Sequence, residues 1–154
     1  MFSLDKSVEL VDETIAININ RLKKYGGNIY PNLEQTLEVL KEKYDLSIVS
    51  NAPENDYIEA FLISSKLGKY FSNYIAASKI KISKGKAIEK MIKDNKLSNA
   101  IYVGDTKKDF EASKEANVSF VQAKYGYGED LKTEYSINEI SELPNIVQKY
   151  FGNQ

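Results

Sequence analysis

The chain has 154 residues, which is long enough for one domain with a substantial core and too short for two comfortable ones. Its 21 basic and 22 acidic side chains leave a formal charge of -1, which gives no electrostatic footprint for nucleic acid or an anionic membrane. Cysteine and histidine are both absent, so thiol catalysis, Ser-His triads and ordinary zinc sites are excluded, and any chemistry must use carboxylates, Lys, Ser, Tyr or a hard metal such as magnesium.

The N-terminal segment is expected to be a helix. Its first residues, MFSLDKSVEL, lack the basic and apolar regions of a signal peptide, and no apolar run approaches the roughly 20 residues of a membrane span, so we expect a cytoplasmic protein. From about residue 5 to 24 the apolar residues recur at spacings of three and four, which predicts one amphipathic helix: Val8, Val11, Ile15, Ile19 and Leu22. Gly26 and Gly27 should end it. The alternative, a strand alternating at Ile15, Ile17 and Ile19, leaves Val8 and Val11 unexplained.

Helices and strands then alternate through most of the chain. The expected helices are 32–44, 55–67, a segment that begins after the N-cap Ser83, 109–116, and 143–151, which Pro144 begins. The expected strands are 46–50, 74–77, 100–103 and 118–122, with a short edge strand at 135–137. This alternation predicts a parallel α/β sheet flanked by helices, in a single domain.

The strand at 100–103 ends in a carboxylate. Ala100 to Val103 is an apolar, β-favouring run, and Gly104 and Asp105 follow it directly. In open α/β sheets ligands bind at the carboxyl ends of the strands, so Asp105 lies where a site is expected. Asp109 follows four residues later, close enough to share a metal ion. The spacing alone also fits a plainer interpretation, in which Asp105 caps the helix at 109–116.

Two further loops should reach the same edge of the sheet. Ser50 and Asn51 follow the strand at 46–50, and Lys84 lies in the first turn of the helix that Ser83 begins. A serine hydroxyl with neighbouring backbone amides can bind phosphate oxygens, and a lysine can neutralise the charge that builds up there. Lysine in a first turn opposes the helix dipole, which favours a role outside the helix. Each residue also has an ordinary explanation, since Ser and Asn are common in turns and most lysines are solvated.

Three segments together resemble a known family. LSIVSNAPENDYIEAFLISSKLGKYF, SKGKAIEKMI and AIYVGDTKKDFEASKEANVSFVQAKYGYG look like the second, third and fourth motifs of the haloacid dehalogenase superfamily, in particular its phosphoglycolate-phosphatase-like branch. The resemblance covers roughly Tyr30 to Leu143. It implies a Rossmann-like three-layer core with a parallel sheet and an inserted cap, and a magnesium-dependent phosphatase that acts on a small phosphorylated molecule.

The resemblance also implies roles for individual residues. Ser50 would be the phosphate-binding hydroxyl, with Asn51 beside it. Lys84 would bind phosphate and neutralise charge in catalysis. Asp105 would be the catalytic, metal-binding carboxylate, with Asp109 as a second magnesium ligand or support.

One motif of the family is missing from this chain. The family begins with a strand that ends in D-x-D-G-T, whose first Asp is the covalent nucleophile, whose second Asp is the general acid, and whose strand is the middle of the sheet. Residues 1–27 resemble instead the last helix of the cap, so we expect a single core domain over 1–154 that is truncated at the first strand and the cap. A forced alignment of FSLDKS with F-D-L-D-G-T would place Ser3 at the nucleophile position.

The missing motif leads to three expectations. Phosphatase activity should be impaired; the alternatives are an inactive phosphate-binding or protein-interaction module, or a fragment completed by a partner chain, and a homodimer stays open. Magnesium binding should be weak or absent, because one carboxylate ligand set is missing. The strands at 46–50 and 100–103 should close up and pair directly, because each buried unpaired backbone group costs about 1–3 kcal/mol. The strand order across the sheet would then be 74–77, 46–50, 100–103 and 118–122. Direct pairing would also move Ser50 towards Asp105.

Overall fold

A computed structural model describes residues 4–152, and their side chains from residue 13 onward. The helices are α1 (Leu4–Tyr25), α2 (Leu33–Lys41), α3 (Asn55–Ser65), α4 (Lys84–Asp94), α5 (Lys107–Glu115) and α6 (Leu143–Gly152). The strands are β1 (Ser47–Ser50), β2 (Asn73–Ala76), β3 (Ile101–Gly104), β4 (Ser119–Ala123) and β5 (Tyr135–Ile137). Short 3-10 turns at Gly68–Tyr70 and Ile140–Glu142 complete the order. Within this range, no helix combines the length and apolar character needed to cross a membrane.

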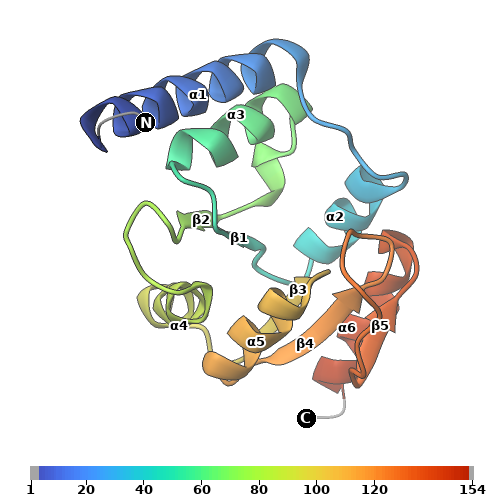
Figure 1. The fold of residues 1–154 in the computed structure, drawn as a ribbon. Helices are drawn as coiled ribbons and strands as arrows, with labels where there is room; N and C mark the ends of the chain where they lie inside the picture. Colours follow the sequence, from blue (N-terminus) through green and yellow to red (C-terminus); the bar gives the residue numbers. More distant parts are fainter. Residues whose placement is uncertain (1–3, 153–154) are drawn as a thin grey trace.

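The N-terminal helix is confirmed. Ile19 of α1 is buried and Ile15 and Leu22 are half-buried, whereas Ile17 has 58% of its surface exposed. A strand would have turned Ile15, Ile17 and Ile19 to one face, so that alternative is wrong. Helix α1 lies along α3, on the far side of the molecule from α6 (Figure 1). The predicted role of Ser3 lies outside the described residues.

Asp105 does not cap helix α5, as the plainer interpretation had predicted. Thr106, and not Asp105, is the N-cap: its side chain accepts a hydrogen bond from the backbone N–H of Asp109, and the Asp109 side chain accepts one from the N–H of Thr106. This reciprocal capping box satisfies two amide groups that the first helical turn would otherwise leave unpaired. Helix α5 therefore begins two residues earlier than predicted, and Asp105 is left free of any capping role.

The strands form two separate parallel sheets. β1 pairs with β2, with Ser50 opposite Ala76, and β3 pairs with β4, which pairs in turn with β5. No pairing joins β1 to β3 in the described part of the chain. The predicted edge position of β5 is confirmed, whereas the predicted direct pairing of the strands at 46–50 and 100–103 is wrong.

That prediction failed because it assumed that the facing strand edges are buried. Every residue of β1 and of β3 keeps part of its surface exposed, so these two strands do not lie in a fully buried core. A solvated amide does not carry the cost of a buried unpaired one, and the two strands therefore gain little by closing up. The predicted movement of Ser50 towards Asp105 depended on direct pairing of these strands, so that pairing does not bring the two residues together.

Helices α2 and α4 connect the two sheets. Helix α2 contributes Leu37 to an apolar cluster beneath β1, β2 and α3, and Leu40 to a second cluster beneath β4, β5 and α6. Helix α4 contacts both β1 and β2 and also packs against α5. Since each of these helices contacts both halves of the fold, the halves form one packed unit without a continuous sheet.

Candidate functional site

The Ser50 loop begins where β1 ends. The Ser50 hydroxyl oxygen accepts a hydrogen bond of 3.1 Å from the N–H of Ala52, and its carbonyl accepts one of 2.8 Å from Ala77. The Asn51 carbonyl accepts a bond of 2.9 Å from the Ser78 hydroxyl, while Asn51 itself is exposed. These contacts fix a turn at the carboxyl end of β1, and the Ser50 O–H can still donate to a ligand.

Lys84 is held at the amino end of α4. Ser83 caps the helix by accepting from the N–H of Lys86 at 3.1 Å, as predicted, and its hydroxyl also donates to Glu115 at 2.7 Å. The next position is Gly85, where an added Cβ would lie 2.2 Å from a carboxylate oxygen of Glu115. The Ser-Lys-Gly order therefore lets α4 approach α5 closely, which directs Lys84 towards the first turn of α5.

Lys84 and Asp109 form a buried ion pair. The Lys84 ammonium lies 2.5 Å from Oδ1 of Asp109, and 17% and 7% of the two side chains remain exposed. Oδ2 of Asp109 accepts from the Thr106 N–H at 3.0 Å and from the Thr106 hydroxyl at 2.7 Å. Burial by itself would raise the pKa of Asp109, but the hydrogen bonds from Lys84 and Thr106 outweigh it and lower that pKa. Asp109 is therefore an anion with both oxygens occupied.

Asp105 lies under the loop that follows β4. Its Oδ2 accepts a hydrogen bond of 2.7 Å from the N–H of Tyr127. An added Cβ at Gly126 would lie 2.3 Å from the Asp105 Cβ, and one at Gly128 would lie 1.9 Å from the Asp105 carbonyl oxygen. Side chains at these two positions would collide with Asp105, so the glycines are what allow the loop to close over it.

Tyr102 joins the Ser50 side of the site to the Asp109 side. Its hydroxyl lies 3.3 Å from the carbonyl oxygen of Val49 and 3.4 Å from Oδ1 of Asp109. Burial, and then the negative charge of Asp109, raise the pKa of the Tyr102 hydroxyl, so it stays protonated and can donate. Because Val49 precedes Ser50 and Asp109 is in the first turn of α5, the carboxyl end of β1 and the loop after β3 face each other.

An aromatic pair forms at the loop that follows β4. Tyr30 and Tyr125 meet edge to face with their ring centroids 4.8 Å apart. Burial, and then the electrostatic effects of Tyr30 and of the Asp105 carboxylate, raise the pKa of Tyr125. Tyr127, by contrast, has 96% of its surface exposed.

The described residues do not fit a strong magnesium site. No group of three His, Cys, Asp or Glu side chains lies close enough to hold a metal ion in the part of the chain searched. Asp109 is engaged by Lys84 and Thr106, which leaves Asp105 as the carboxylate best placed to meet a cation. Magnesium prefers six oxygen ligands in near-ideal geometry, and one carboxylate supplies too few of them. The proposed metal roles of Asp105 and Asp109 stay predictions.

Sequence reasoning missed several contributors to the site. Tyr102 gave no signal, since an aromatic residue in an apolar run is typical of a strand. Thr106 could have been recognised from the Thr-x-x-Asp spacing, which is a variant of the capping-box pattern. The contact of Gly126 and Gly128 with Asp105 depends on tertiary structure, and no local pattern reveals it.

The chain resembles known proteins in sequence. Residues 2–123 match the family model described as haloacid dehalogenase-like hydrolase. The chain is 30% identical over 114 residues to phosphoglycolate phosphatase from Haemophilus influenzae; the match covers 67% of this chain and 50% of that protein. The chain thus spans about half the length of this curated relative.

Two solved structures show the same fold. A predicted phosphoglycolate phosphatase from Haemophilus somnus superimposes with a TM-score of 0.70 at 24% identity, covering 79% of this chain and 58% of that one. A 2-haloacid dehalogenase from Pseudomonas syringae gives 0.73 at 19% identity, covering 97% and 65%. The protein has a Rossmann-like α/β fold with its candidate site at the carboxyl ends of parallel strands. It belongs to the haloacid dehalogenase-like hydrolase family.

Proposed function

We propose that this chain supplies the phosphate-binding part of a phosphomonoester hydrolase site and has little hydrolytic activity by itself. The observation that carries the proposal is the buried Lys84–Asp109 pair, connected through Tyr102 to the end of β1, where Ser50 lies. The family membership and the similarity to phosphoglycolate phosphatases support a small phosphorylated molecule as the ligand.

Each residue has a chemical task in this proposal. The Ser50 hydroxyl donates a hydrogen bond to a phosphate oxygen, with Asn51 beside it at the mouth of the loop. The Lys84 ammonium neutralises the charge of the phosphoryl group, and Asp109 holds that ammonium in place. Asp105 orients the loop at Tyr127 and faces the bound ligand.

Low activity follows from the carboxylates that the site offers. Acyl-phosphate chemistry needs a carboxylate that is positioned for attack. Asp109 is paired and buried, and Asp105 is bonded to the Tyr127 amide under its loop. Groups that stabilise a phosphoryl group without a positioned nucleophile leave water to attack unaided, which forgoes the advantage of orientation.

Hydrolysis of phosphoglycolate and of p-nitrophenyl phosphate, with and without magnesium, tests the proposal. We expect turnover well below about 1 s⁻¹, the lower end of ordinary enzyme rates. Turnover at or above that rate, abolished by Asp105→Asn, would show that the chain is a complete enzyme. A parallel titration with inorganic phosphate, followed by NMR, should shift the amides around Ser50 and Lys84. Loss of those shifts in Lys84→Met, but not in Lys90→Met on the exposed face of α4, is the expected control result.

A second candidate is a phosphate-binding module with no catalytic role. The engagement of both Asp109 oxygens by protein donors favours it, because this carboxylate is not free for chemistry. Phosphate binding with no detectable turnover, even at high enzyme concentration, would select this candidate. We further propose a cytoplasmic location, in keeping with a small phosphorylated ligand.

A further inference from the structure

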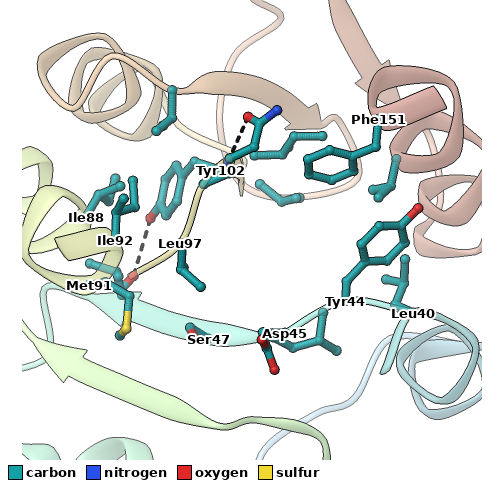
Figure 2. A pocket seen from close by; sticks show the side chains of 18 of the residues that line it. Leu40, Tyr44, Asp45, Ser47, Ile88, Met91, Ile92, Leu97, Tyr102 and Phe151 are labelled. Carbon is teal, nitrogen blue, oxygen red and sulfur yellow. Dashed lines mark hydrogen bonds between the residues drawn. The ribbon is translucent and has the colours of Figure 1, made fainter. Parts of the chain in front are cut away.

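Two different contacts restrain the carboxylates that follow β3. Tyr102, which Figure 2 shows in the cavity between β3 and β1, brings its hydroxyl within 3.4 Å of Oδ1 of Asp109. Asp105 is restrained instead by the connection between β4 and β5, because its Oδ2 accepts a hydrogen bond of 2.7 Å from the Tyr127 N–H. The position of Tyr127 therefore influences which way the Asp105 carboxylate turns.

The connection between β4 and β5 contains neither a helix nor a strand. It spans residues 124–134, which we call the β4–β5 loop, and it joins two parallel strands. Parallel strands are usually joined by a helix, which pairs its own backbone groups. A connection without a helix must find partners for its N–H and C=O groups in other parts of the chain. Those partners decide the path of the loop.

Gln122 supplies two of the partners through its side chain. The Nε2 group donates to the carbonyl oxygen of Glu129 at 2.7 Å, and Oε1 accepts from the N–H of Leu131 at 3.0 Å. A residue of a parallel strand bonds in the same way, with one donor and one acceptor, to two residues of its neighbour. The side-chain amide of Gln122 thus takes the place of a neighbouring strand for the segment at 129–131.

Gln122 is a fixed anchor for the loop. None of its surface is exposed, and its backbone lies in β4 opposite Gly104 on one side and Ser136 on the other. A buried amide is costly unless its donor and its acceptor are paired, which favours the geometry in which both bonds to the loop are made. Gly104 directly precedes Asp105, so the anchor is paired with the residue next to the carboxylate that the loop covers.

The anchored segment limits the movement of Tyr127. Two residues of chain reach at most about 7 Å, so fixing Glu129 keeps Tyr127 within that distance of a fixed point. Gly128, between them, packs against the Asp105 carbonyl. Glu129 is exposed, so without Gln122 its carbonyl could bond to water and the loop could lift away from Asp105.

We propose that Gln122 is a positioning residue for the candidate site: its buried amide fixes the β4–β5 loop and so holds the Tyr127 N–H on the Asp105 carboxylate. A hydrogen bond from an amide offsets part of a carboxylate's charge and fixes its orientation. In the proposed function Asp105 faces a phosphate, so without this bond its charge would oppose the ligand more strongly. The effect on phosphate rests on the proposed function, whereas the effect on the loop does not.

Amide hydrogen exchange of Gln122→Met, followed by NMR, tests the hold on the loop. Methionine is close to glutamine in size, but it has no donor and only a weak acceptor. We expect the Tyr127 amide to exchange about tenfold faster or more, while that of Ala60, buried in α3, changes less than about twofold. The matched control is Gln148→Met, the same substitution at an exposed position of α6, which should leave both rates unchanged.

Phosphate affinity provides a readout that a loss of packing alone would not move. In a titration with inorganic phosphate, Gln122→Met should raise Kd about threefold or more, whereas Gln148→Met should not change it. In an Asp105→Asn background, which removes the charge, Gln122→Met should change Kd less than about 1.5-fold. An equal loss of affinity in both backgrounds would overturn the proposal, because Gln122 would then not act through Asp105.

The remaining outcomes are also decisive. Unchanged Tyr127 exchange or unchanged Kd in folded Gln122→Met would overturn the proposal. If that variant does not fold, the native chain replaces it: the Tyr127 and Leu131 amides should open together, with exchange rates within about threefold after correction for their intrinsic rates, and a larger difference would overturn the proposal. If the native chain binds no phosphate, the proposed function fails, and Tyr127 exchange still decides whether Gln122 holds the loop on Asp105.

Discussion

Replacing Asp109 by Asn should destabilise the fold through a single, well-defined change. The carboxylate accepts from the Lys84 ammonium at one oxygen and from the Thr106 amide and hydroxyl at the other. An asparagine keeps the shape, but its NH₂ group must face either the ammonium or the Thr106 donors. The substitution also leaves the buried Lys84 without its counter-ion.

The size of the expected loss in unfolding free energy follows from the burial of the Lys84–Asp109 pair. Hydrogen bonds to charged groups contribute about 1.5–3 kcal/mol, and breaking a fully buried ion pair costs about 3–5 kcal/mol. Because Lys84 keeps 17% of its side chain exposed, water compensates part of the loss, and we expect about 2–4 kcal/mol. For a chain of this size that corresponds to a fall in Tm of about 5–15 °C.

The loss of stability caused by Asp109→Asn should become smaller at acidic pH. The pKa of Asp109 lies below its ordinary value of 3.8, so its ionised form stabilises the native state. This stabilisation is fully present above the unfolded pKa and is lost as the pH falls through the folded pKa. The difference between the native chain and Asp109→Asn should therefore be constant at neutral pH and should shrink below about pH 4.

Urea denaturation at neutral and acidic pH measures both quantities. Glu89→Gln is the matched control, because Glu89 pairs with Lys86 on the exposed face of α4, where an ion pair contributes about 0.5 kcal/mol or less. The reasoning is refuted if Asp109→Asn costs no more than Glu89→Gln, or if its effect grows as the pH falls.

Two further predictions concern the Asp105 loop and the metal. Gly128→Ala should destabilise by about 1–3 kcal/mol in thermal unfolding, because its Cβ would lie 1.9 Å from the Asp105 carbonyl oxygen; Gly152→Ala, whose Cβ meets nothing within 4 Å, should have no such effect. Magnesium should bind in the millimolar range or not at all, since one carboxylate is too few ligands for a hard cation, and calorimetry that gives micromolar affinity would contradict this.

The local signals in the sequence predicted most of the elements. The spacing of Ile15, Ile19 and Leu22 predicted α1, Ser83 predicted the start of α4, and the apolar runs predicted the strands. These features depend on neighbours within one or two helical turns. Boundaries were less accurate: the helix predicted over 32–44 ends at Lys41, and Glu42 and Lys43 form a turn before β1.

The contacts within the site required tertiary structure. Sequence patterns predicted that Lys84 and Asp109 lie near one edge of the sheet, but they did not predict the ion pair between them. The close contact of α4 with α5 at Gly85 brings the two together, and no local pattern reveals it. The separation of β1 from β3 was also missed, because sequence alone did not show that every residue of these two strands stays partly exposed.

Amide hydrogen exchange by NMR tests most directly the central claim, that β1 and β3 stand apart with unpaired facing edges. The Ser47 and Val49 amides should exchange at least about 100-fold faster than that of Val121, which lies in β4 between two paired neighbours. No nuclear Overhauser effects should join the backbone of β1 to that of β3. Equal protection of Val49 and Val121, together with such contacts between β1 and β3, would contradict the account.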